Sequence, residues 1–218
     1  GDVYKRQEYA ELNPVISPDG NILYFERLNH PENNYGVHGS QDIWYSEKDS
    51  YGEWMQAKRM PNNVNSARYN VVFSVLDNGY TLLVSGVYSK NGKWKKRGLS
   101  ETHKVADYWS NPKAIKVKGL QRKNKGQAFD AFMSVDKKVL MMSFSKHLNR
   151  KKTDLFVSIK KEGKNKWSSP KKVKPMKHAS SIEQAPCISP DGDTLYFSTN
   201  YSFDDFPSGG KKDYSIYY

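Results

Sequence analysis

Few residues of this chain have the type and spacing that catalysis or metal binding needs. The five histidines among its 218 residues share no paired spacing on one element, and the single cysteine cannot complete a histidine–cysteine zinc site. The Gly-x-Ser-x-Gly elbow, which presents the nucleophile of an α/β-hydrolase, does not occur. The sequence therefore predicts a protein that is not an enzyme, with no catalytic residue, no metal ligand and no cofactor.

Two weaker metal hypotheses stay open. His30 and His38 share one long polar segment and could meet in space. Asp204, Asp205 and Asp213 lie in a glycine-rich segment, and carboxylates suit calcium, although their spacing matches no EF-hand loop. Solvated loop residues are the commoner explanation in both cases, so neither set is predicted as a site.

Positive charge is concentrated in the middle of the sequence. Residues 89–177 hold 26 of the 35 Lys and Arg but 6 of the 23 Asp and Glu, within a net charge of +12. Runs at 93–97, 122–125 and 150–152 could attract a polyanion such as an acidic glycan or a lipid headgroup. Lysines at strand ends also keep sheet edges soluble. No nucleic-acid-binding module accompanies the basic runs, so we expect no nucleic-acid partner.

Composition and termini set further limits. No stretch approaches the roughly 18 consecutive apolar residues of a membrane span, so the chain is predicted not to span a membrane. Residues 1–7 fit no repeat or strand pattern and are interpreted as a non-native N-terminal addition. Cys187 lies in an apolar strand, where we expect a small buried thiol.

A hairpin signature of the type Ser-Pro-Asp-Gly occurs four times. The copies begin at Ser17, Ser74, Ser134 and Ser189, and their aspartates are 58, 59 and 55 residues apart. Pro presets the first turn position, Asp bonds its own backbone, and Gly takes the left-handed position that follows. Each signature therefore predicts a turn between two antiparallel strands.

Two more strands complete each repeat. A short apolar strand follows every turn, and a third strand follows a longer polar loop. In the first three repeats a tryptophan, at 54, 109 or 167, marks the start of a fourth strand. The weak segment 98–101 is expected to supply the third strand of the second repeat. Four strands per repeat is the blade plan of a β-propeller, and the predicted blades span residues 8–66, 67–120, 121–176 and 177–218.

The predicted last blade lacks a fourth strand. Because known propellers have about 4 to 8 blades and close into rings without free edges, we expect this chain to be a fragment of a larger propeller. A genuine ring of four blades stays open as the alternative.

Two segments carry a family resemblance. Residues 183–198 and 11–20 resemble the WD40-like repeat of TolB-type propellers. The resemblance covers residues 8–218, with departures at Lys137, where the turn favours Gly, and at Val71 and Ala131, where the first strand favours Pro. It implies an all-β propeller in the periplasm or at the outer membrane of Gram-negative bacteria. Such repeats are often fused to a peptidoglycan-binding OmpA-type domain.

The function that follows from this resemblance is a non-enzymatic platform for an envelope protein or peptide. Trp94 is the one tryptophan outside the repeat, and it lies among lysines. Trp44, Trp54, Trp109 and Trp167 recur with the repeat, which favours a packing role. The candidate binding residues are Glu11, Asn13, His30, Asn33, Asn34, Tyr35, Trp94, Lys95, Lys96, Arg97, Glu183 and Gln184. For Glu11 and Glu183, bracing of adjacent blades is an equal alternative.

The sequence leaves three other functions open. A polysaccharide-directed propeller would use the basic middle of the chain, either to bind an acidic glycan or to act like oligogalacturonate lyase. Similar propellers also cap prolyl oligopeptidase-type peptidases, which need a hydrolase domain that this segment lacks. A purely structural spacer is a further alternative.

Overall fold

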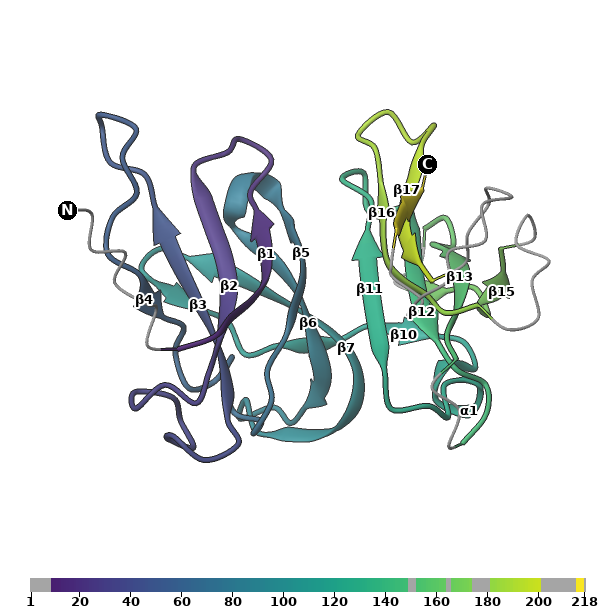
Figure 1. Cartoon of the computed structure of the whole chain (residues 1–218), viewed down its shortest axis with the longest axis horizontal. Helices are drawn as coiled ribbons and strands as arrows, with labels where there is room; N and C mark the ends of the chain where they lie inside the picture. Colours follow the sequence, from purple (N-terminus) through teal and green to yellow (C-terminus); the bar gives the residue numbers. More distant parts are fainter. Residues whose placement is uncertain (1–8, 149–151, 164–165, 174–180, 201–214, 218) are drawn as a thin grey trace, which may run out of the picture. The chain divides into compact units, whose positions relative to one another are not determined.

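The computed structural model describes residues 9–148, 152–163, 166–173, 181–200 and 215–217. The chain divides into two compact units, unit 1 (Gly1–Ala114) and unit 2 (Ile115–Tyr218), which are described separately. Both are built from antiparallel sheets whose strands follow one another in sequence order (Figure 1). The all-β prediction with four-stranded blades is confirmed by these sheets.

Unit 1 contains two sheets. The first has four antiparallel strands in the order of the sequence, β1 (Glu11–Ile16), β2 (Ile22–Leu28), β3 (Gln41–Glu47) and β4 (Lys58–Arg59). The second has β5 (Val72–Leu76), β6 (Thr81–Tyr88), β7 (Trp94–Val105), β8 (Tyr108–Trp109) and β9 (Lys113–Ala114), of which β8 and β9 both pair with β7. The 3₁₀ turn η1 (Asp77–Gly79) joins β5 to β6.

Unit 2 repeats this plan. One sheet has the order β11 (Phe129–Met133), β12 (Val139–Phe144), β13 (Asp154–Ile159) and β15 (Lys171–Lys172). Another has β16 (Glu183–Ile188), β17 (Leu195–Thr199) and β18 (Ser215–Tyr217). A short parallel pair joins β10 (Lys116–Val117) to β14 (Lys166–Trp167), and α1 (Leu120–Lys123) follows β10.

The turn signatures fold as their chemistry predicts. In the first, Ser17 Oγ donates to Asp19 Oδ1 at 2.5 Å and accepts from the Ile22 backbone N–H at 2.9 Å. The same pair of bonds recurs around Ser134 and around Ser189. In each of the three turns the serine hydroxyl, as the largest cause, and the backbone N–H two residues after the aspartate lower the pKa of that aspartate. Serine and aspartate therefore close three of the four blade-opening hairpins by one mechanism.

Lys137 occupies the turn position that Gly20 and Gly192 fill in the other copies. Its φ is 56°, in the left-handed region that glycine adopts most readily, compared with 73° and 85° for the two glycines. The backbone bond from Lys137 N to Ser134 O, 2.8 Å long, keeps the turn closed. The departure from the repeat thus changes local strain and leaves the hairpin intact.

The core of unit 1 lies between its two sheets. Tyr24 is buried, and its hydroxyl donates to the Gly79 carbonyl at 3.0 Å across from the second sheet. Gly79 has a φ of 95°, which favours glycine, and an added Cβ would lie 2.5 Å from Cδ1 of Ile22, which would have to move. The cluster consists of Ile22, Tyr24, Ile43, Met60, Val64, Val72, Val75, Leu82, Val84, Tyr88 and Trp109.

Two burial expectations are corrected. Each repeated tryptophan precedes the fourth strand as predicted, yet only some are packed: Trp109 is 9% exposed and Trp54 is 43% exposed. Trp54 instead lies beneath the Lys48 ammonium, 5.0 Å from the ring centroid, because its segment forms only an isolated bridge to that lysine. Cys187 is exposed and not buried, because the bulge in β16 between residues 184 and 187 alters the alternation of faces.

Candidate functional site

The candidate site lies where three connecting segments meet at one end of unit 1, the lower end in Figure 1. They are the β2–β3 loop (29–40), the β4–β5 connection (60–71) and the β6–β7 hairpin (89–93). Ser66 is the junction: its carbonyl accepts from the Tyr35 hydroxyl at 3.4 Å and its Oγ accepts from the Trp94 backbone N–H at 2.9 Å. Asn34 Nδ2 donates to the carbonyl of the preceding residue, Asn65, at 3.1 Å.

Buried amide side chains in the β4–β5 connection bond the backbone of this connection and of β3. Asn65 is fully buried; its Oδ1 accepts from Ile43 N at 2.8 Å and its Nδ2 donates to the carbonyls of Ile43 and Met60. Asn70, also fully buried, bonds the Ala67 backbone N–H at 3.0 Å. These contacts fix the position of Ser66 relative to β3.

Aromatic rings are exposed around this junction. Tyr35, Tyr69 and Trp94 retain 46%, 55% and 42% of their accessible surface. The Arg68 guanidinium lies 5.3 Å from the Tyr35 ring centroid and donates to the His38 carbonyl at 2.8 Å. Exposed tyrosine, tryptophan and arginine are the side chains that most often contribute large shares of binding energy at interfaces.

Trp94 is held by the geometry of its own hairpin. A Cβ added to Gly86, whose φ is 99°, would lie 2.6 Å from Cδ1 of the Trp94 indole. The indole therefore lies directly against the bare backbone of β6, in a place that only glycine leaves free.

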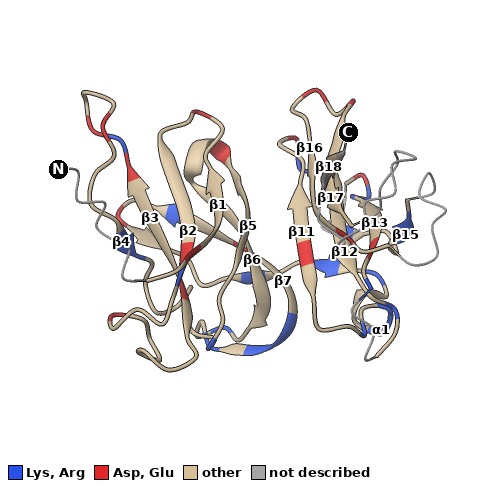
Figure 2. Ribbon diagram, in the orientation of Figure 1, with Lys and Arg blue, Asp and Glu red and all other residues tan. Residues whose placement is uncertain are grey.

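The start of β7 presents a basic segment beside Trp94. Two bulges interrupt its pairing with β6, so the alternation of buried and exposed residues is lost and all of 94–97 are exposed. Figure 2 shows this segment in blue at the beginning of β7. We call one set of residues the aromatic–basic surface: Tyr35, Arg68, Tyr69, Trp94, Lys95, Lys96 and Arg97.

Three other predicted residues gather around Trp44. Glu11 pairs with Arg27 at 2.9 Å, and the Arg27 guanidinium lies 4.6 Å from the Trp44 ring centroid. The His30 ring contacts Trp44 edge-on at 4.5 Å, and buried Asn33 accepts the indole N–H at 3.1 Å. Glu11, His30 and Asn33 therefore belong to a packed cluster at the start of the β2–β3 loop.

Asn13 contacts a buried acid. Its Nδ2 donates to Glu26 Oε2 at 2.8 Å, while the Val72 backbone N–H donates to Oε1 at 2.9 Å. Burial raises the pKa of the Glu26 carboxyl to about 8, although both donors act in the opposite direction. Asn13 has a φ of 47° at a bulge in β1, so its side chain is directed inward to Glu26.

Glu183 and Gln184 lie in β16 of unit 2. Glu183 is buried; its carbonyl accepts from Ser143 Oγ and Thr153 Oγ1, each at 2.6 Å, and Ser181 donates to its carboxyl. Burial raises the pKa of this carboxyl. The Gln184 carbonyl accepts from Ser198 Oγ at 3.3 Å. Glu183 thus joins β16 to the preceding sheet of unit 2, the contact that the bracing alternative describes.

Of the predicted set, Asn34, Tyr35, Trp94, Lys95, Lys96 and Arg97 lie together on or beside the aromatic–basic surface. The surface also contains Arg68 and Tyr69, and it depends on Ser66; sequence reasoning missed all three. These three residues lie in the β4–β5 connection, which contains no sequence motif. The asparagines between 62 and 70 are the one feature of the sequence that indicates an ordered loop there.

Within the described ranges, no group of three or more His, Cys, Asp and Glu side chains could hold a metal ion. Asp204, Asp205 and Asp213 lie outside the described residues. None of the described helices is long and apolar enough to cross a membrane.

Comparison with known proteins gives structural likenesses only. No family model and no curated protein sequence matches the chain. A putative TolB from Agrobacterium tumefaciens is 14% identical over 91% of this chain and 72% of its own, with a TM-score of 0.45. A periplasmic gluconolactonase from Pseudomonas aeruginosa is 13% identical over 85% and 63%, with a TM-score of 0.43.

A puromycin-hydrolyzing peptidase from Mycobacterium tuberculosis is 11% identical, with a TM-score of 0.43. The match covers 87% of this chain but 27% of the peptidase. The assignment of blades rests on the sheets and registers described above.

Proposed function

We propose that this chain is a non-enzymatic interaction module, whose aromatic–basic surface binds a protein or peptide partner with acidic and apolar side chains. One observation carries the proposal: the Tyr35 hydroxyl and the Trp94 backbone N–H, from two different blades, both donate to Ser66, the Trp94 indole packs against Gly86, and both rings remain exposed. Rings that are exposed and already held in place lose little conformational freedom on binding.

The chemistry of the surface fits such a partner. Tyrosine and tryptophan bury large apolar areas at an interface, and Arg68 adds a cation that its bonds to the His38 and Gly39 carbonyls hold beside the Tyr35 ring. Lys95, Lys96 and Arg97 add positive charge next to Trp94. Their field would raise the rate of association with an acidic segment and make it sensitive to salt.

The cellular setting is part of the proposal. The likeness of residues 11–20 and 183–198 to TolB-type repeats supports a location in the periplasm or at the outer membrane. The partner would then be an envelope protein or one of its exposed peptide segments.

The test is selection of peptides from a displayed random library against the full chain, followed by measured dissociation constants. Trp94→Ala and Tyr35→Ala should each weaken the selected peptides by about tenfold or more, which corresponds to about 1.4 kcal/mol. Tyr51→Ala is the matched control, because Tyr51 is highly exposed in unit 1 and outside the surface. Selected peptides that bind Trp94→Ala and Tyr35→Ala as tightly as the wild type would overturn the assignment of the aromatic–basic surface as the binding site.

An acidic polysaccharide is the second candidate, favoured by the aromatic faces beside Lys95, Lys96 and Arg97. Polygalacturonate and a neutral polysaccharide serve as probes with the same variants. Capture of polygalacturonate that is lost in Trp94→Ala, with no selected peptide dependent on that residue, would replace the peptide partner by a glycan.

A further inference from the structure

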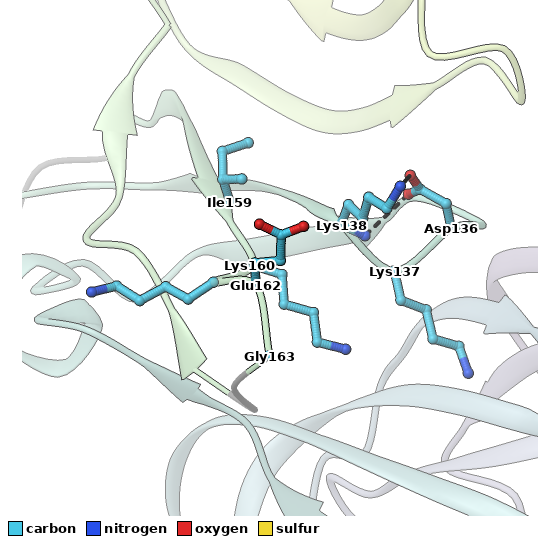
Figure 3. A pocket seen from close by; sticks show the side chains of 8 residues that line it. Asp136, Lys137, Lys138, Ile159, Lys160, Glu162 and Gly163 are labelled. Atoms are coloured by element: carbon cyan, nitrogen blue, oxygen red, sulfur yellow. Dashed lines mark hydrogen bonds and ion pairs between the residues drawn. The ribbon is translucent and has the colours of Figure 1, made fainter.

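A hollow in unit 2 is surrounded by lysines from two neighbouring hairpins. It has a volume of about 690 Å³, within the range of small-ligand sites. Figure 3 shows Asp136, Lys137 and Lys138 on the β11–β12 turn, and Ile159 at the end of β13 with Lys160, Glu162 and Gly163 after it, on either side of the hollow. The lining residues are Asp136, Lys137, Lys138, Ile159, Lys160, Lys161, Glu162 and Gly163.

The lysines stand on backbone that is bonded in place. Lys160 N donates to the Lys138 carbonyl at 2.9 Å, which ties the end of β13 to the start of β12. Lys161 N donates to the Lys166 carbonyl at 2.8 Å. The charges are therefore gathered by the fold and not by a flexible tail, so little backbone ordering is needed to bind an anion.

A second hollow adjoins the first through Lys161. It has a volume of about 320 Å³ and is lined by Lys116, Val117, Lys118, Lys161, Lys166 and Trp167. In the parallel pair of β10 and β14, Lys116 lies directly opposite Lys166. Like charges in facing positions destabilise a sheet, and a bound anion would offset that repulsion.

Among the described residues, two carboxylates, Asp136 and Glu162, line the first hollow with four lysines, and Asp136 already accepts hydrogen bonds within its own turn. Asp136 accepts from Ser134 Oγ at 2.6 Å and from the Lys138 backbone N–H at 3.0 Å, which holds it in its own turn. Its ion pair with Lys138, drawn in Figure 3, is 3.8 Å long between exposed groups. Such a pair is weak, so an incoming anion can compete for Lys138.

The number and spacing of the cations indicate the class of anion. Among the described residues that line the two hollows, every cation is a lysine, and each hollow has four. Lysine binds phosphate as a compact point charge, so several lysines close together favour an anion that carries several charges in a small volume.

We propose that the two lysine-lined hollows of unit 2 bind an anion that carries several phosphate groups close together. This site is independent of the aromatic–basic surface of unit 1. The anion could be a free oligophosphate or a phosphorylated headgroup on a membrane surface, and the chemistry of recognition is the same.

The experiment measures binding of tripolyphosphate to the full chain by calorimetry at about 50 and about 200 mM salt. The double variant Lys160→Gln and Lys161→Gln should weaken binding by about tenfold or more, which corresponds to about 1.4 kcal/mol. Arg122→Gln with Lys125→Gln removes the same charge from exposed positions of unit 2 outside both hollows, and should change affinity by less than about threefold.

Further measurements distinguish a free oligophosphate from a membrane headgroup, and separate a failure of this proposal from a failure of the proposed function. Phosphatidylcholine vesicles with a phosphatidylinositol bisphosphate headgroup test the membrane source against free tripolyphosphate. Trp94→Ala should leave tripolyphosphate affinity unchanged, so this proposal and the proposed function fail separately. Equal loss in the control double variant, equally tight binding of polygalacturonate or a DNA oligonucleotide, or no binding at about 50 mM salt would each overturn the site.

Discussion

Glu26 in β2 accepts the backbone N–H of Val72 in β5 at 2.9 Å, so a buried carboxyl group joins the two sheets of unit 1. Asn13 donates to the other oxygen of this carboxyl at 2.8 Å. Burial nevertheless raises the pKa to about 8, from an ordinary value of 4.5. The protonation of this residue should therefore contribute to the pH dependence of the stability of unit 1.

The sign of that dependence follows from where the proton is bound. Between pH 4.5 and about 8 the folded state keeps a proton that the unfolded chain has released. The stabilisation is complete below pH 4.5 and is lost as the pH rises through about 8. We expect the free energy of unfolding to fall by on the order of 5 kcal/mol across this range, since the pKa rises from 4.5 to about 8 and one pKa unit corresponds to about 1.4 kcal/mol.

Glu26→Gln tests this, because the amide resembles the protonated carboxyl and cannot titrate. Urea denaturation of the wild type should show the fall with pH, and the variant should lose most of it. Glu53→Gln, at an exposed position of the same unit, serves as the control. A wild-type stability that does not fall, or falls equally in Glu26→Gln, would show that another group titrates.

Gly86→Ala should displace Trp94. The new Cβ would lie 2.6 Å from the indole, and the backbone at φ 99° is unfavourable for alanine. We expect a loss of about 1–3 kcal/mol in stability and a shift of the Trp94 indole N–H resonance, which Trp94→Phe identifies. Gly20→Ala is the control for backbone strain alone, because Gly20 also has a positive φ but no atom within 4 Å of the added Cβ. An unshifted resonance in Gly86→Ala would contradict the placement of Trp94.

Two tryptophans of unit 1 should respond differently to truncation. Trp109 belongs to the buried cluster and contacts the Tyr24 ring edge-on at 6.2 Å, so Trp109→Ala should cost about 3–5 kcal/mol. Trp54 is exposed beneath Lys48, so Trp54→Ala should cost less than about 1 kcal/mol. Denaturant midpoints with unchanged slopes measure both. Equal losses would mean that the repeat position, and not burial, sets the contribution.

Asn65→Ala should destabilise the β4–β5 connection. The change leaves the buried backbone N–H and C=O of Ile43 and the C=O of Met60 without these bonds, at a cost of about 2–4 kcal/mol. Gln56→Ala removes an exposed amide of the same unit and should be close to neutral. Hydrogen exchange of the Ile43 amide gives a local measurement. Unchanged protection of that amide in Asn65→Ala would contradict the role assigned to the side chain.

The turns and strands within each repeat could be predicted from the sequence alone. Ser17 and Asp19, and their counterparts in two other copies, define their turns through bonds within about five residues, so sequence proximity alone determines the contact. The weak segment 98–101 was also identified correctly as strand, inside β7. Each tryptophan precedes its fourth strand for the same reason, because that order belongs to a single blade.

The tertiary structure decided everything that depends on contacts between repeats. Burial of Trp109 and exposure of Trp54 follow from which sheet lies against each ring, and equivalent repeat positions need not have equivalent neighbours. Exposure of Cys187 follows from a bulge that shifts the faces of β16.

The two candidate surfaces have the same origin. Ser66 joins Tyr35 to Trp94 across 28 residues or more, and the lysine hollows gather segments between positions 116 and 166. The sequence showed that the middle of the chain is basic, but a count of charges along the chain does not show which lysines lie close together in space. The sequence alone determined the strands and turns, since those bonds are local; the sites required the packed chain, since long-range contacts depend on the whole arrangement of strands.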